Sequence, residues 1–317
     1  MKSPEVSSRA LTVWVTTAMV GPVALVSAGS SWSALAVVAI LCGVLCAAVY
    51  KSWEGGVCNS KLVNVLFLLW NVYAVAAVAS MAGQCWPGKE SQIATSLVLI
   101  ALGALSASKG ERSACAVSAT LFPLCAAIFA IVLICGIGSI RWDRVEVSTV
   151  PPGGMLIFVF LLPIAAVTIP RSANLSVGGL AFIGLLGIAL SVSVMGTLSL
   201  PVMLTKKDAF FEFSKGLNLF GVVQRFEAVV AVAVTLSLYA MLSLLLSSIG
   251  SMAERVCPGS SKWAVHLSAV LSIVIEVFEL WLSAKVTALV SIFVWGFLGA
   301  AQRIFGEKKK KNLDISS

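Results

Sequence analysis

Continuous apolar runs, bounded by charged residues or by proline, glycine and serine, fill most of this sequence of 317 residues. The hydrophobic set makes up 59% of the chain and only 11% is charged, against about 25% charged residues in soluble domains. A water-soluble domain of this size cannot bury so much apolar surface, and so few charges exclude a disordered chain. The runs do not alternate with polar residues, which argues against a transmembrane β-barrel. The sequence therefore predicts an all-α integral membrane protein.

Ten of these runs approach the roughly 20 residues that a helix needs to cross a bilayer, and each predicts one transmembrane helix. Only three residues, 283–285, separate the last two runs. A single helix over 263–302 would be about 60 Å long. The hydrocarbon core is only about 30 Å thick, so the chain must turn back near Lys285. The predicted spans are 10–28, 33–50, 62–83, 93–107, 113–138, 154–169, 177–200, 226–249, 263–281 and 286–302.

The distribution of basic residues predicts the orientation of these spans. With the N-terminus in the cytoplasm, 14 of the 22 Lys and Arg residues fall in inner segments and 8 in outer ones. The positive-inside rule then predicts a multi-pass membrane protein with both termini cytoplasmic. The formal net charge of +8 is explained by these loops. It implies the lipid bilayer as a partner and does not imply nucleic acid.

Ten spans favour one transmembrane domain over residues 1–317 that is built as a five-plus-five inverted repeat, the LeuT-like architecture, with halves 10–138 and 154–302. In such folds the first helix of each half is broken near the midplane and forms the substrate site. Gly21 and Pro22 interrupt the first span, and Leu162-Pro163 interrupts the sixth at a matching place. Proline is common in membrane helices, so chance is the alternative explanation for this match.

Ionisable residues inside a membrane usually mark function or pairing, because their burial in lipid is costly. Glu276 and Glu279 lie in the ninth span three residues apart, hence on one face, with Lys285 as a possible partner for Glu279. Glu276 predicts either a proton-relay carboxylate or a hydrogen-bonded structural glutamate. Arg225 and Glu227 open the eighth span; being two residues apart they do not face each other, so each needs another partner.

Neutral polar residues are the remaining candidates for a ligand site. Asn71 and Tyr73, near the middle of the third span, offer a hydrogen-bond donor and an aromatic face, and Tyr239 in the eighth span is a further candidate. The alternative is that such groups bond their own backbone or a neighbouring helix. The eight cysteines form no C-x-x-C pair and the chain has a single histidine, so we expect no metal and no cofactor. Nucleophile and metalloprotease motifs are missing, and we expect no enzyme.

The outer segment 204–225 mixes four phenylalanines with several charged residues. This composition predicts a short interfacial helix. It serves either as a plain surface helix or as an outer lid over a ligand site.

Several stretches resemble the permease-like B subunit of spore germinant receptors, a family within the amino acid–polyamine–organocation superfamily. Residues 216–227, GLNLFGVVQRFE, look like the family's stretch before the eighth helix with its R-x-E pair. Residues 107–112, ASKGER, are similar to its glycine-and-glutamate turn before the fifth helix. The opening around Gly21-Pro22 and the segment 168–171 also fit. The chain departs from the family at 161–164, where LLPI replaces an unwound aromatic-glycine motif.

The resemblance implies a germination protein that binds a small nutrient, an amino acid or a sugar-like germinant, between spans one, three, six and eight. It implies signalling without covalent chemistry, in the inner membrane of a spore. A larger membrane receptor subunit with soluble domains and a small lipoprotein subunit are the implied partners. Gly21, Pro22 and Pro163 would expose backbone groups to the ligand, and Asn71, Tyr73 and Tyr239 would line its pocket.

Two rival hypotheses remain open. In the first, the chain is an ion-coupled secondary amino acid transporter, in which Glu276 or Glu227 carries the proton, or Thr235 and Ser237 help to hold sodium. In the second, the chain is an assembly subunit without a ligand, whose helices serve only as packing surface.

Overall fold

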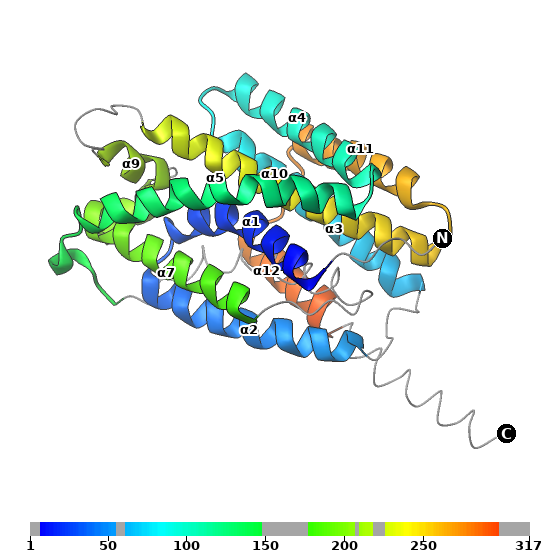
Figure 1. The fold of residues 1–317 in the computed structure, drawn as a ribbon, viewed down its shortest axis with the longest axis horizontal. Helices are drawn as coiled ribbons and strands as arrows, with labels where there is room; N and C mark the ends of the chain where they lie inside the picture. Colours follow the sequence, from blue (N-terminus) through cyan, green and yellow to red (C-terminus); the bar gives the residue numbers. More distant parts are fainter. Residues whose placement is uncertain (1–6, 55–60, 148–176, 207–208, 218–225, 298–317) are drawn as a thin grey trace, which may run out of the picture.

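The computed structural model describes residues 7–54, 61–147, 177–206, 209–217 and 226–297, and every regular element within them is helical (Figure 1). The helices lie roughly along a common direction and form one bundle. In chain order they are α1 (Ser8–Ser27), α2 (Trp32–Glu54), α3 (Lys61–Gln84), α4 (Lys89–Ser108), α5 (Glu111–Ile137), the 3₁₀ turn η2 (Trp142–Arg144), α7 (Val177–Leu198), α8 (Leu200–Thr205), α9 (Ala209–Gly216), α10 (Phe226–Val256), α11 (Ser261–Val277), α12 (Ala284–Ile292) and the π-helical turn η5 (Phe293–Phe297).

Six helices in the described part of the chain, namely α1, α3, α4, α5, α7 and α10, are long and apolar enough to cross a membrane. The prediction of an all-helical, membrane-embedded protein is therefore confirmed at this level. In α2 and in α12 with η5, the apolar stretches whose side chains the structure describes are Trp32–Val44 and Val286–Gly296. The predicted sixth span, 154–169, lies outside the described residues, so the count of ten and the inverted repeats 10–138 and 154–302 stay predictions.

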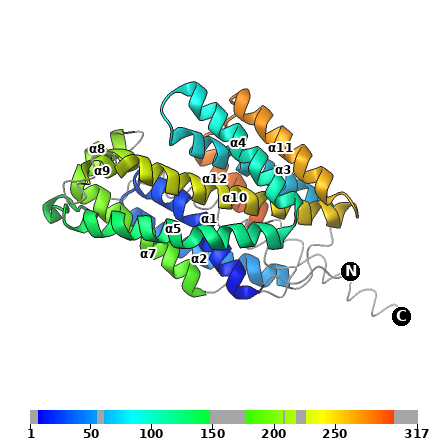
Figure 2. The same ribbon diagram turned by 45° about the horizontal axis from the view of Figure 1, so that its top comes forward.

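Helix α10 lies at the centre of the bundle, with α1, α3, α4, α5 and α11 packed against it (Figure 1, Figure 2). Its 31 residues make a helix of about 46 Å at 1.5 Å per residue. Residues 240–250 are all buried, so three consecutive turns expose no side. A helix that is apolar on every face is stable only when protein or lipid surrounds it.

The peripheral helices turn large apolar side chains outward. On α2, Ile40 is 68% exposed, on α5 Ile134 is 70% exposed, and on α7 Leu185 is 67% exposed. In water such a surface would drive association, whereas lipid tails match it. These faces are the natural lipid-contacting surface of the bundle.

The predicted outer segment 204–225 contains one short helix, α9, and it begins where the short helix α8 ends. Phe210 and Phe213 on α9 are fully buried, and the Phe210 ring stacks on Phe129 of α5 at a centroid distance of 6.3 Å. The charged residues face outward, where Lys215 donates to Glu212 at 2.9 Å and holds the pKa of that carboxyl below its usual value. The aromatic residues thus fix α9 to the bundle.

Helix α11 ends earlier than the predicted span 263–281. Glu279 adopts a left-handed conformation with φ of 51°, and the amides of Glu279 and Leu280 donate to the carbonyls of Glu276 and Ile275. These two bonds form a Schellman motif, which stops the helix at Val277. The turn was predicted near Lys285, and the chain makes it a few residues earlier, between the end of α11 and the start of α12.

Close approach of α3 and α4 depends on a glycine. A Cβ atom at Gly83 would lie 2.6 Å from both the Gln92 carbonyl oxygen and the Ser96 hydroxyl. Small residues at such crossings let two helix backbones approach in a membrane, where packing rather than the hydrophobic effect drives association.

We expect Gly83→Ala to push α3 and α4 apart and to cost about 1–3 kcal/mol of stability, the usual range for overpacking. Gly43→Ala in α2 is the matched control, because nothing lies within 4 Å of the added methyl group. The measurement is thermal unfolding of both purified variants in the same detergent. Equal melting temperatures for the two variants would contradict the close approach.

Candidate functional site

The predicted interruption at Gly21-Pro22 is not an unwound segment, because α1 runs continuously through both residues. The hydroxyl of Ser237 on α10 instead enters the hydrogen-bond ladder of α1. It accepts from the Gly21 amide at 2.6 Å and donates to the Thr17 carbonyl at 2.5 Å. The predicted break does not occur because a side chain of the neighbouring helix α10 binds the backbone groups that the break would have exposed.

Glycine and proline both contribute to this junction between α1 and α10. Pro22 has no amide hydrogen, so the Ala18 carbonyl loses its helical donor, and the Ser237 hydroxyl lies 3.5 Å from that oxygen. A Cβ at Gly21 would lie 2.9 Å from the Ser237 side chain and from the Val234 carbonyl. Only glycine therefore allows the serine to reach the α1 backbone.

Asn71 contacts α10 far from this junction. Its amide nitrogen donates to the Met252 sulfur at 3.4 Å, and its Oδ1 is enclosed without a hydrogen-bond partner among the described residues. Met252 lies 15 residues beyond Ser237 on α10, or about 22 Å along the helix axis. Gly21 and Asn71 therefore do not face one small ligand.

Tyr73 faces away from Asn71, as two residues on a helix must. Its hydroxyl accepts from the Leu282 amide at 3.1 Å and lies 3.3 Å from the Thr287 hydroxyl. Its ring contacts Trp70 and Trp281. Tyr73 thus holds the turn between α11 and α12, and the structure does not bring it together with the α1 junction.

The other predicted residues are dispersed or lie outside the described part of the chain. Tyr239 and Glu227 lie 12 residues apart on α10, about 18 Å, and both are partly buried. Thr235 and Ser237, proposed as a sodium pair, point to different helices: Thr235 accepts from Trp86 Nε1 at 3.3 Å, while Ser237 faces α1. The residues outside the description are Leu162, Pro163 and Arg225.

Glu276 lies in a polar cluster among α3, α4 and α11. Its Oε1 lies 3.3 Å from the hydroxyl of Ser96, which is fully buried. Its Oε2 is enclosed and has no partner within the described ranges. The Ser96 hydroxyl also lies 2.9 Å from the Ala79 carbonyl and 3.0 Å from the Gln92 carbonyl. One hydroxyl proton therefore stands among three acceptors.

Glu279 pairs with Lys89 at the start of α4, at 3.1 Å. Both side chains are largely exposed, so the pair contributes at most about 1 kcal/mol. The side chain of Lys285, the predicted partner, lies outside the description. The pair links the end of α11 to α4 next to the Glu276 cluster.

Comparisons with known proteins give no relative. No protein-family model matches this chain, and no curated protein sequence matches it. Within the described residues no three His, Cys, Asp or Glu side chains gather as a metal site would require. The functional assignment therefore depends on the two polar junctions, Gly21–Ser237 and Ser96–Glu276.

Sequence reasoning named Gly21 and Glu276, and it named Ser237 only together with Thr235 as a sodium ligand; it predicted neither the Gly21–Ser237 pair nor the Ser96–Glu276 pair. Ser237 and Ser96 belong to a large set of hydroxyl residues in apolar runs, and nothing in the sequence separates them from the others. Trp14 was not singled out, although its indole nitrogen lies 3.3 Å from both the Ala240 carbonyl and the Ser243 hydroxyl. The sequence indicates such a contact of Trp14 only in that its indole N–H lies inside an apolar span and needs a hydrogen-bond acceptor there.

We expect Ser237→Ala to cost about 1–3 kcal/mol, because it removes a buried hydroxyl that donates to the Thr17 carbonyl and lies beside the Ala18 carbonyl, which has no helical donor at Pro22. Ser118→Ala is the matched control, since its buried hydroxyl donates to the Ala114 carbonyl of its own helix. Thermal unfolding in detergent measures both. A Ser237→Ala protein as stable as the control would show that the serine does not satisfy α1.

Proposed function

We propose that this chain is a permease-like membrane subunit that binds a small nutrient, an amino acid or a similar solute, and signals its presence in germination. The observation that supports this most directly is the junction between α1 and α10, where a side chain holds backbone groups of a proline-interrupted helix. The resemblance to germinant-receptor B subunits supports the same function, and part of its R-x-E motif, Glu227, lies in the first turn of α10.

The proposed mechanism is an exchange of partners at Gly21. The carboxylate of the ligand takes the Gly21 amide from the Ser237 hydroxyl, and α1 then opens at Pro22. A backbone amide at the start of a half-helix favours negative charge. The ligand shifts the population toward the opened form in proportion to its differential affinity for the two forms.

In this proposal the protein lies in the inner membrane of a spore with both termini cytoplasmic. A larger membrane receptor subunit and a lipoprotein subunit receive the conformational signal. No bond of the ligand is made or broken, so the chain acts as a sensor rather than as an enzyme.

The test is a panel of amino acids and sugars added to the purified protein, with binding measured by calorimetry and by the shift of the melting temperature. Ser237→Ala removes the internal competitor for the Gly21 amide, so we expect it to lower stability yet tighten binding, by up to about tenfold for 1.4 kcal/mol. Ser118→Ala leaves the affinity unchanged. A ligand that binds Ser237→Ala more weakly, or a panel without any ligand, contradicts the proposal.

A second candidate function, an ion-coupled secondary transporter, is favoured by the Glu276 cluster. When Glu276 is protonated, its carboxyl group donates to the Ser96 hydroxyl, and that hydroxyl donates to one backbone carbonyl. Each proton then has an acceptor of its own. A carboxyl that holds a proton inside the bundle and has one free oxygen is suited to proton coupling.

Uptake into proteoliposomes under a proton gradient tests this function. Glu276→Gln keeps the hydrogen bonds of a protonated carboxyl but cannot release a proton, so we expect substrate binding to persist and gradient-driven uptake to be lost. Glu279→Gln, three residues further on and exposed, is the control that keeps uptake. Gradient-driven uptake by Glu276→Gln would exclude this carboxyl as the proton carrier.

A further inference from the structure

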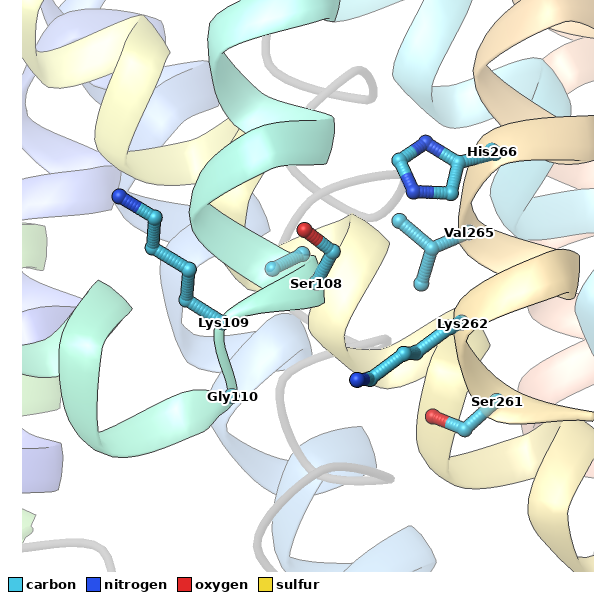
Figure 3. Close-up of a pocket in the computed structure, with 8 residues that line it drawn as sticks. Ser108, Lys109, Gly110, Ser261, Lys262, Val265 and His266 are labelled. Carbon is cyan, nitrogen blue, oxygen red and sulfur yellow. The ribbon is translucent and has the colours of Figure 1, made fainter. Parts of the chain in front are cut away.

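A basic cleft opens between the turn that joins α4 to α5 and the first turns of α11. It has a volume of about 630 Å³ and lies far along the bundle from Glu276 and Glu279, at the opposite end of α11 (Figure 3). Ser108, Lys109 and Gly110 come from the turn, and Ser261, Lys262 and His266 from α11. In Figure 3 the Lys262 side chain extends from α11 toward the turn, and the His266 ring lies one helical turn further on.

The cationic groups of this cleft have no acidic partner in the described part of the chain. Neither Lys109 nor Lys262 takes part in an ion pair there. The carboxylate of Glu254 accepts from the Gly259 and Ser261 amides, and Glu111 accepts from the Ser251 hydroxyl. The nearby acids are thus engaged with other groups, and the residues that line the cleft carry a net positive charge.

Exposed aliphatic side chains continue from the cleft along α4 and α11. Helices α4 and α11 lie side by side along one edge of the bundle (Figure 1, Figure 2). Each presents outward a row of aliphatic side chains that runs toward the cleft, and Trp263 beside it is 80% exposed, as suits a residue at a membrane interface. The exposed rows are Val98, Leu102 and Leu105 on α4, and Leu267, Val270 and Val274 on α11.

From this combination we propose that the cleft binds the phosphate headgroup of an anionic phospholipid, whose acyl chains lie along the exposed aliphatic rows of α4 and α11. A free anion would use the charged end alone, whereas a phospholipid matches both the cations and the aliphatic rows that continue from them. The distribution of Lys and Arg predicts that this end faces the cytoplasm. Anionic lipids at such a surface attract lysines.

The bound lipid joins two helices that are far apart in the sequence. Its headgroup bridges the α4–α5 turn to the start of α11, and its tails cover the outward faces of both helices. It therefore stabilises the pairing of α4 with α11. This inference does not depend on the proposed function, since a sensor, a transporter and an assembly subunit would all retain such a lipid.

Native mass spectrometry of the delipidated full-length protein tests the site, with phosphatidylglycerol and phosphatidylcholine of identical acyl chains as probes. We expect phosphatidylglycerol to bind more tightly, and Lys262→Gln to weaken it about fivefold, which corresponds to about 1 kcal/mol per lysine. Lys61→Gln, at the start of α3 and away from the cleft, removes the same charge and serves as the control; its effect stays below about twofold because of screening.

Three results would overturn the proposal. Equal binding of the two lipids would show that the headgroup charge is not recognised. Equal weakening by Lys262→Gln and Lys61→Gln would show a general charge effect without a site. Displacement of phosphatidylglycerol by millimolar inorganic phosphate would assign the cleft to a soluble anion instead of a lipid.

Discussion

Close packing around α10 is the constraint on which the rest of the bundle depends. Lipid tails are as apolar as leucine, so helices in a membrane are held together by packing and by hydrogen bonds rather than by the hydrophobic effect. Glycines make that packing possible at three of the contacts of α10. It meets α1 at Gly21, it meets α4 at Gly103, and its own Gly250 admits Ser261 of α11. The buried turns of α10 therefore set the positions of the surrounding helices.

Hydropathy predicted the helices well and their ends less well. An apolar run reports a span directly, because the bilayer selects for length and composition. The end of α11 depends instead on Glu279 in a left-handed conformation that usually favours glycine, at a cost of about 1–2 kcal/mol. No local pattern marks this residue, and its partner Lys89 is remote in sequence. Such ends follow from tertiary contacts that a single sequence does not display.

Individual residues of the candidate site could be predicted from the sequence, but the contacts between them could not. Gly21-Pro22 and Glu276 stand out in the sequence because a Gly-Pro pair and a carboxyl differ from the apolar residues around them. Asn71 and Tyr73 are two residues apart in the sequence, yet they contact different helices because a helix turns through about 200° in two residues. The predicted pocket assumed that residues near the midplane converge. The structure shows instead that each is engaged by its nearest helix.

The two junctions are connected through α10 and the turn between α3 and α4. Thr235, two residues before Ser237, accepts from Trp86 Nε1, and the Trp86 carbonyl accepts from the Gln92 side chain at 3.2 Å. The Gln92 carbonyl faces the Ser96 hydroxyl, which contacts Glu276.

The steps of this chain of polar contacts are short, and one turn of α10 carries both Thr235 and Ser237. In the proposed opening of α1, release of Ser237 would allow that turn to rotate, and a rotation would displace Thr235 from Trp86. The contacts from Trp86 through Gln92 and Ser96 would carry that displacement toward Glu276. A ligand that opens α1 would thereby alter the setting of the buried carboxyl, which is the physical requirement for either signalling or proton coupling.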